Sequence, residues 1–291
     1  MVLGKTEIVS IDLNKINEFI NQNDCINLVF NSWKSEQFIQ TGSLKDIAQF
    51  FFVGNAINFR FWYDSYKHVF EYKGYKGSTA MWIVMRNNPL LMDASYLSRI
   101  DVSKEDGLCD MPNAEKRQMA LREAGSVLLE KYDGEILNLC EKCVWDAMRI
   151  VDEIAVNFPM WEDSYQGVAF RKRAILFVAM LHGRLLPDSK LKNIDKLHCL
   201  ADYQVPKILH NLGILQYSNE LEKTIGSHQW IMYQSDYETA IRVKTIEAVN
   251  LICRQLEYRG IEVCPLQLDY YLWKIAHDID EPYHLTDTVA Y

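Results

Sequence analysis

The sequence lacks the signals of several large protein classes. It has no apolar run long enough to cross a membrane, and it reaches Lys5, Glu7 and Asp12 without the apolar core of a signal peptide. It also lacks a Gly-x-Ser-x-Gly elbow, a Walker loop, a dinucleotide fingerprint and a His-Glu-x-x-His zinc motif. These absences predict a cytoplasmic protein with no membrane partner, and they exclude the enzyme classes that depend on those motifs.

Positively charged residues are outnumbered by negatively charged ones. The chain has 31 Lys and Arg against 39 Asp and Glu, a formal net charge of −8. A protein that grips nucleic acid by its phosphates needs clustered cations, so we expect no direct nucleic-acid partner. An acidic balance suits a cationic small ligand, but many cytosolic proteins are acidic without binding one.

Cysteines are few and odd in number. The seven thiols of a cytoplasmic chain are expected to stay reduced. Cys140 and Cys143 form a lone Cys-x-x-Cys with no second pair and no nearby histidine, so zinc is not expected there. Their apolar neighbours have helical spacing, which favours small core residues. We therefore predict neither a metal nor a cofactor.

The 291 residues contain no internal repeat, low-complexity segment or Gly-Ser linker. This organisation predicts a mainly α fold that forms a single helical unit over residues 1–291. A subdomain over 1–100 that packs on a helical part over 101–291 is the alternative. The oligomeric state is left open.

A small β contribution is predicted in the N-terminal third. Residues 7–11 form an extended candidate, and a helix follows to about Asn21. Aromatic residues crowd the next part of the chain, and residues 58–69 are the best place for strands because aromatics favour pleated surfaces. Gly74 and Gly77 indicate a turn or a close backbone approach. Most of the aromatic side chains are expected in the core, and some could line a pocket for a flat base.

The rest of the chain shows helical periodicity. Helix starts are indicated at residues 103–106 and 112–115, and the expected helices cover 113–130, 135–156, 169–186, 239–255 and a segment that begins at Pro265.

The segment Leu200–Lys207 places one carboxylate, Asp202, before a probable helix start at Pro206. Proline fits the first turn of a helix and pushes the preceding residue out of the α region, so Val205 is expected to be extended. The helix should end near Gly213. Its buried side should be formed by Ile208, Leu209 and Leu212.

Asp202 has two possible roles on this pattern. The amides of the helix start would allow the carboxylate to be half buried and still ionised, which suits a group that stabilises a transient cation. Alternatively, Asp202 only caps a turn. The local pattern leaves both roles open.

The cations at 171–173 and the carboxylate of Asp269 each allow a structural and a ligand-binding interpretation. Arg171, Lys172 and Arg173 cover about 300° of a helix, so at least one must lie near the packed side. Either all three extend to solvent, or one enters a pocket and meets a phosphate or ribose oxygen. Asp269 borders the apolar stripe of the last helix, where it either pairs with a core arginine or is kept for a ligand.

The segment 200–207, Leu-Ala-Asp-Tyr-Gln-Val-Pro-Lys, resembles the signature Phe-Ala-Asp-Tyr-Arg-Val-Pro-Gln of the queuosine salvage family, the queuosine 5′-phosphate N-glycosylases. Further blocks match this family in the same order along nearly the whole chain. They are Asn58–Trp62, Gly77–Trp82, Phe170–Ala174, Leu268–Trp273 and the tail His284–Tyr291. The sequence departs from the pattern where Leu200 replaces an aromatic residue, Gln204 an arginine and Lys274 an acidic residue, and it has no histidine before Asn58.

The resemblance implies a helical fold similar to that of DNA glycosylases and an N-glycosyl hydrolase that needs no metal. The implied partner is a small molecule: queuosine 5′-monophosphate, or queuosine itself, is cleaved to release the base queuine for salvage into tRNA. Asp202 would be catalytic, and Asp269 would bind the base.

The remaining implied contacts are also with the substrate. Lys172 is favoured for the 5′-phosphate, with Arg171 and Arg173 as the other candidates. Asn58 and Tyr270 would supply polar contacts, and Leu200 and Tyr203 would flank the catalytic carboxylate. Two other functions remain as rivals: a base glycosylase of DNA repair, and a queuine- or queuosine-binding protein without catalysis.

Overall fold

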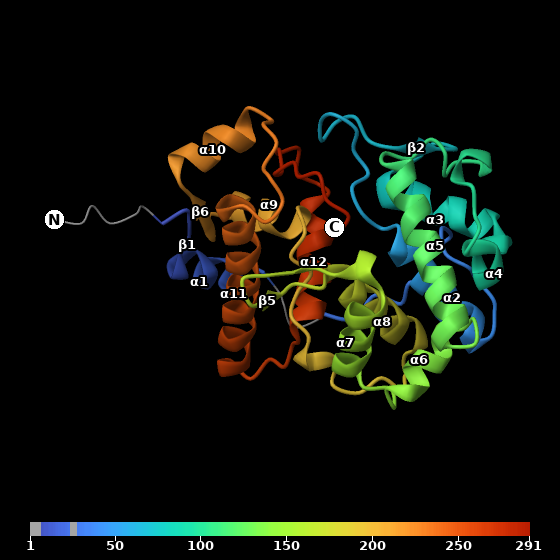
Figure 1. The fold of residues 1–291 in the computed structure, drawn as a ribbon. Helices are drawn as coiled ribbons and strands as arrows, with labels where there is room; N and C mark the ends of the chain where they lie inside the picture. Colours follow the sequence, from blue (N-terminus) through green and yellow to red (C-terminus); the bar gives the residue numbers. More distant parts are fainter. Residues whose placement is uncertain (1–6, 24–27) are drawn as a thin grey trace. The chain divides into compact units, whose positions relative to one another are not determined.

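The computed structural model describes residues 7–23 and 28–291 (Figure 1). In these residues the chain is mainly α-helical, and its strands form three two-stranded antiparallel sheets, so the predicted mainly α class is confirmed. Three strands, Ser164–Tyr165, Val168–Ala169 and Leu215–Tyr217, lie outside the N-terminal third, where the β contribution was expected. The chain divides into two compact units. Unit 1 comprises Met1–Phe30, Ser164–Phe170 and Asp195–Asp287, and unit 2 comprises Asn31–Asp163, Arg171–Ile194 and Thr288–Tyr291. Each unit is described by itself.

In the residues that the structure describes, unit 1 combines two small sheets with five helices. Strand β1 (Val9–Ile11) pairs with β6 (Leu215–Tyr217), and β4 (Ser164–Tyr165) pairs with β5 (Val168–Ala169). The helices are α1 (Leu13–Gln22), α9 (Gln204–Asn211), α10 (Asn219–Gly226), α11 (Asp236–Tyr258) and α12 (Pro265–Ala276). The strand and helix expected before residue 22 are therefore confirmed.

Helices α9, α11 and α12 pack on one another and enclose the core of unit 1 (Figure 1). Their apolar stripes repeat with helical spacing, as in Ala248, Val249 and Ile252 on α11. Burying one such aliphatic side chain contributes about 1.5–3 kcal/mol, so the stripes fix how the three helices pack. Gly213 (φ 72°) follows α9 in the left-handed region, and the predicted end of this helix is confirmed.

Unit 2 is built from helices and one hairpin. Its helices are α2 (Leu44–Ala56), α3 (Gly77–Asn87), α4 (Ala94–Leu97), α5 (Ala114–Lys131), α6 (Ile136–Lys142), α7 (Ala147–Asn157) and α8 (Lys172–Leu185). The hairpin pairs β2 (Glu71–Tyr72) with β3 (Tyr75–Lys76). Short 3₁₀ turns occupy Pro89–Met92, Val102–Lys104 and Pro159–Trp161, and a further one spans Ile194–Lys196.

The core of unit 2 is aromatic and centres on α2. Phe50, Phe51 and Phe52 are fully buried, and Phe52 stacks on Trp161 with ring centroids 4.9 Å apart. Offset aromatic pairs add about 0.5–1.5 kcal/mol beyond the area that they bury. The expectation that most aromatic residues lie in the core is confirmed.

The strands expected within residues 58–69 are wrong. This segment forms only an isolated bridge between Trp62 and Val69. Its carbonyl groups have another partner: the buried guanidinium of Arg117 donates hydrogen bonds to the carbonyl oxygens of Phe59 and Arg60. A cation therefore satisfies backbone acceptors that a neighbouring strand would otherwise satisfy.

Two helix predictions also need correction. The helix expected over 135–156 is broken between α6 and α7, where Val144 and Trp145 are left-handed (φ 50° and 60°). The break is fixed by backbone hydrogen bonds in both directions with Lys192: its N–H donates to Trp145, and its carbonyl accepts from Ala147. The helix start expected at residues 103–106 yields only a 3₁₀ turn.

We predict that Gly125→Ala destabilises the protein. A Cβ at Gly125 of α5 would lie 2.6 Å from the carbonyl oxygen of Ala94 and close to the backbone nitrogen of Ser98. Backbone cannot move aside as a flexible side chain can, so overpacking should cost about 1–3 kcal/mol or more. That exceeds the helix-propensity gain of about 1 kcal/mol from Gly to Ala. A thermal melt should show a lower Tm.

Gly226→Ala is the matched control. Gly226 lies at the end of α10, and nothing lies within 4 Å of a Cβ built there. The same substitution should leave the Tm unchanged or raise it. A Gly125→Ala variant that melts no lower than Gly226→Ala would contradict the close approach of α4 and α5.

The tail of unit 1 contains a buried histidine. Leu285 forms a parallel bridge with Trp230, and its carbonyl accepts the N–H of Ile231 at 2.8 Å. His284, the preceding residue, is buried. Burial, and secondarily the positive charge of Arg242, lowers the pKa of His284 from 6.5 to about 3.

We predict that His284 makes stability depend on pH. Its pKa is lower in the folded state, so the unfolded chain binds more protons between about pH 6.5 and pH 3. Stability is therefore lost as the pH falls through this window, by up to about 1.4 kcal/mol per unit. The non-titrating His284→Gln variant should show a smaller loss of Tm between pH 7 and pH 4.5 than the parent. An equal loss would show that His284 is not held neutral.

Candidate functional site

The loop before α9 carries Asp202, and the helix begins earlier than expected. Helix α9 starts at Gln204, so Val205 is helical and the prediction of an extended Val205 is wrong. Pro206 is the third residue of the helix, where its missing N–H costs nothing because the first-turn N–H groups have no intrahelical partner. The carboxylate of Asp202 accepts the N–H of Gln204 at 2.7 Å, so Asp202 does cap the turn. This geometry is compatible with either role of Asp202.

Two buried charged groups hold the backbone just before Asp202. The N–H of Leu200 donates to Asp269 Oδ1 of α12 at 2.8 Å. The carbonyl oxygen of Ala201 accepts from Arg242 Nε of α11 at 2.8 Å. Hydrogen bonds to charged groups are about twice as strong as neutral ones, so this loop has a fixed course. The Asp269 carboxylate thus meets a backbone amide, a partner that was not considered from the sequence.

The carboxylates of Asp202 and Asp269 both raise the pKa of the same buried thiol, Cys199. The pKa of Cys199 is raised well above its usual range by burial first, and then by Asp269, Cys253 and Asp202. The two carboxylates are 5% and 3% exposed. The structure therefore brings the two acidic site predictions together in one buried region of unit 1.

The other predictions in unit 1 surround the same loop and α12. Leu200 is buried, and Tyr203 packs its ring on Tyr283 with centroids 4.5 Å apart. Tyr270 is half-buried and lies 6.0 Å from Trp273 by ring centroids, and burial raises its pKa. Apolar and aromatic surface thus accompanies the carboxylates, which is the usual make-up of a small-molecule site.

Lys172 and its neighbours lie in unit 2. Lys172 begins α8, its N–H donates to Asp163 Oδ2 at 3.1 Å, and the residue is 6% exposed. Arg173 is buried too: its guanidinium lies over the rings of Phe59 and Trp161. The expectation that at least one of the three cations faces the packed side is confirmed.

Arg171 behaves differently from its two neighbours. It is left-handed (φ 45°) and pairs with the exposed carboxylate of Asp152. Asn58, also in unit 2, is buried, and its Nδ2 donates to Asn55 Oδ1 at 3.0 Å. Both Lys172 and Asn58 thus have positions set by a neighbouring polar group.

The departures from the family pattern lie in different environments. Lys274 is exposed on α12. Gln204 is half-buried, and its Oε1 is buried without a hydrogen-bond partner in the part of the chain that the structure describes.

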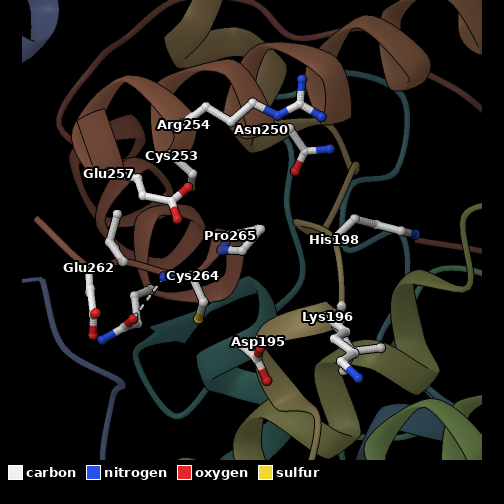
Figure 2. Close-up of a pocket in the computed structure, with 13 residues that line it drawn as sticks. Asp195, Lys196, His198, Asn250, Cys253, Arg254, Glu257, Glu262, Cys264 and Pro265 are labelled. Carbon is white, nitrogen blue, oxygen red and sulfur yellow. Dashed lines mark hydrogen bonds between the residues drawn. The ribbon is translucent and has the colours of Figure 1, made fainter. Parts of the chain in front are cut away.

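Unit 1 also has a cavity of about 700 Å³ that none of the predicted site residues lines. Figure 2 shows Asn250, Cys253 and Arg254 of α11 on one side, and Cys264 and Pro265 at the start of α12. Its remaining lining residues are Asp195, Lys196, Leu197, His198, Glu257, Glu262, Val263 and Gln267. The lining mixes both charges, and through His198 it adjoins the start of the loop that leads to Asp202.

Sequence reasoning missed Arg242 and its partner. Arg242 Nη1 lies 3.3 Å from Glu238 Oε1, and both side chains are 1% exposed. The signal was present: the two residues are four apart and share the α11 stripe with Thr245 and Val249. Charged residues on an apolar stripe are seldom buried unless they are paired.

Residues 7–23 and 28–291 contain no group of three or more His, Cys, Asp and Glu side chains that could hold a metal ion. Cys140 and Cys143 are both buried, as expected of core residues. None of the helices in these residues is both long and apolar enough to span a membrane.

Known proteins are similar to this chain over nearly its full length. Residues 38–291 match the model of a family described as queuosine salvage protein. A protein of Sphaerobacter thermophilus, named queuosine 5′-phosphate N-glycosylase/hydrolase, is 32% identical over 282 residues, which covers 89% of this chain and 86% of the relative. Proteins of the same name from Bos taurus (30% identical; 91% and 87% covered) and Dictyostelium discoideum (32%; 84% and 78%) are also similar. The chain belongs to the queuosine salvage protein family.

Proposed function

We propose that this protein is an N-glycosylase that hydrolyses queuosine 5′-monophosphate and releases the base queuine. The observation that carries the proposal is the full-length similarity to relatives that share this name. It is supported by two buried carboxylates, Asp202 and Asp269, beside apolar and aromatic side chains in unit 1.

Asp202 is the proposed catalytic residue. Cleavage of a ribosyl N-glycosidic bond passes through an oxocarbenium-like state, and a carboxylate beside the sugar lowers its energy. The same group can orient or deprotonate the attacking water. Its hydrogen bond from the Gln204 N–H is compatible with this role, because the bond fixes the direction of the carboxylate before substrate arrives.

Asp269 is proposed to bind the leaving base. The base is a 7-deazaguanine and has no N7 to protonate, so its departure depends on hydrogen bonds to the guanine edge. That edge presents N–H donors, and the aminomethyl linker is positively charged, so both call for a carboxylate. A carboxylate can accept about four hydrogen bonds. Support of the Leu200 N–H is therefore compatible with contact to the base.

The remaining proposed contacts are made by Lys172, Asn58, Tyr270, Leu200 and Tyr203. Lys172 is the proposed cation for the 5′-phosphate, as the family resemblance implies. Arg173 donates to backbone carbonyls, and Arg171 pairs with Asp152. Asn58 and Tyr270 supply polar contacts to the sugar or base. Leu200 and Tyr203 flank Asp202 and offer apolar surface to the substrate.

The direct test is chromatography of queuosine and its 5′-monophosphate after incubation with the purified protein. Release of queuine from the monophosphate, faster than from the nucleoside, supports the proposal. Tight binding of both compounds without release would indicate a binding protein, and activity on damaged duplex DNA would indicate a repair glycosylase.

We expect Asp202→Asn to lower kcat while substrate affinity stays within a few fold. The isostere keeps the shape and the hydrogen bond to Gln204 but removes the charge, which matters mainly in the transition state. Loss of one preorganised electrostatic group costs about 10²–10³ in rate. Single-turnover kinetics and direct binding of queuosine 5′-monophosphate measure the two quantities.

A melting temperature completes this test. An unchanged Tm would show that any loss of rate does not come from unfolding. Near-normal kcat in Asp202→Asn would leave only the turn-capping role, and Asp269 would become the next carboxylate to test.

We expect Lys172→Ala to raise KM for the 5′-monophosphate far more than for queuosine. A charge-assisted contact to phosphate is worth about 1.5–3 kcal/mol, or roughly ten- to a hundredfold in affinity. Arg171→Ala is the matched control on the adjacent residue and should change both KM values alike. Equal losses on both substrates in Lys172→Ala would show that another group binds the phosphate.

A further inference from the structure

We infer that Arg242 is a positioning residue that aims the Asp202 carboxylate; this inference rests on the proposed function. The carbonyl of Ala201 and the N–H of Asp202 belong to one peptide group. Arg242 Nε donates to the Ala201 carbonyl oxygen at 2.8 Å, and the N–H of Asp202 donates to the carbonyl oxygen of Leu200 at 2.8 Å. The peptide is therefore held at both ends, and the Cα of Asp202 is attached directly to it.

Rotation of this peptide would change the direction of the Asp202 side chain. A shift of about 1 Å in a catalytic group can cost on the order of a hundredfold in rate. The hydrogen bond from the Gln204 N–H fixes the carboxylate at the end of the Asp202 side chain. The hydrogen bond from Arg242 fixes the peptide group to which the Cα of Asp202 is attached. Both constraints are needed to define one direction.

Arg242 is itself held rigidly. Its guanidinium carbon lies 3.9 Å from the centroid of the Phe170 ring, and Nη1 lies 3.3 Å from Glu238 Oε1. The planar guanidinium can stack on a ring, pair with a carboxylate and donate from Nε at the same time. A lysine ammonium lacks that planar fork, so it cannot reproduce the three contacts together.

Fold stability alone is a weak explanation for this pair. The desolvation of two fully buried charges offsets their attraction, and such pairs can often be replaced by apolar side chains without loss. Here each of the two charged side chains also forms a hydrogen bond with a backbone group in a non-helical segment. Arg242 holds Ala201, and Glu238 Oε2 accepts the N–H of Gln234 at 3.2 Å. The pair thus anchors the loop before α9 and the turn before α11.

The first experiment is Arg242→Lys, which keeps the charge. With queuosine 5′-monophosphate, kcat should fall about ten- to a hundredfold, the usual effect of one lost hydrogen bond to a charged group. Substrate affinity should change by no more than a few fold, because Arg242 acts on the aim of Asp202. A loss confined to KM would overturn the inference.

A double-mutant cycle separates positioning from general damage. If Arg242 acts through Asp202, adding Arg242→Lys to Asp202→Asn should lower kcat by less than twofold, because the charge to be aimed is already gone. Equal fold losses in both backgrounds would overturn the inference and leave the proposed function intact. Normal kcat in Asp202→Asn alone would instead count against the proposed role of Asp202 and against this inference with it.

Two more variants test whether a loss of kcat comes from misfolding and not from a displaced Asp202. Phe170→Leu keeps Arg242 but removes the ring on which it stacks, so it should give a smaller loss of kcat that also disappears in the Asp202→Asn background. Leu221→Ala on α10 removes a buried core side chain of unit 1 that makes no hydrogen bond to the loop. It should lower Tm and leave kcat unchanged well below its melting point. An equal kcat loss in Leu221→Ala would overturn the inference.

Discussion

The peptide group between Ala201 and Asp202 is the constraint on which the site depends. Arg242 of α11 holds its oxygen, and the carbonyl of Leu200 holds its nitrogen. Asp269 of α12 holds the N–H of Leu200 itself. The three helices that form the core of unit 1 therefore also fix the loop, since α9 begins where the loop ends. The helices whose packing forms this core are therefore also the helices that hold the loop before Asp202.

Unit 2 uses buried arginines on irregular backbone in the same way. Arg117 donates to the carbonyls of Phe59 and Arg60, and Arg173 donates to those of Ala56 and Met160. Aromatic rings cover these guanidinium groups. A planar cation with five donors can satisfy several carbonyls at once, which helps explain how non-helical segments can be buried in a helical protein.

Helices with strong periodicity were predictable because local spacing determines which face is buried. The segments 113–130 and 239–255 and the start at Pro265 correspond to α5, α11 and α12. Failures have non-local causes. The break at Val144 and Trp145 depends on the distant Lys192, and within 58–69 the carbonyl oxygens of Phe59 and Arg60 are bonded by the distant Arg117.

The division into two units was equally hidden. The chain passes between them several times through ordinary loops, and no linker composition marks the crossings. At the candidate site, motif and stripe pointed to Asp202 and Asp269, and the structure buries both carboxylates. The hydrogen bond from the Leu200 N–H to Asp269 could not be predicted, because the two residues are 69 apart in sequence. The bond from the Gln204 N–H to Asp202 is local and corresponds to the turn-capping role considered from the sequence.

The central claim is that water attacks the ribosyl carbon of queuosine 5′-monophosphate and expels an intact base. Mass spectrometry after a reaction in heavy-oxygen water tests this most directly. We expect one heavy oxygen in the released ribose 5-phosphate, none in queuine, and the same partition in slower reactions of Asp202→Asn. Unlabelled sugar phosphate, label in the base, or free phosphate with intact queuosine as the product would contradict it.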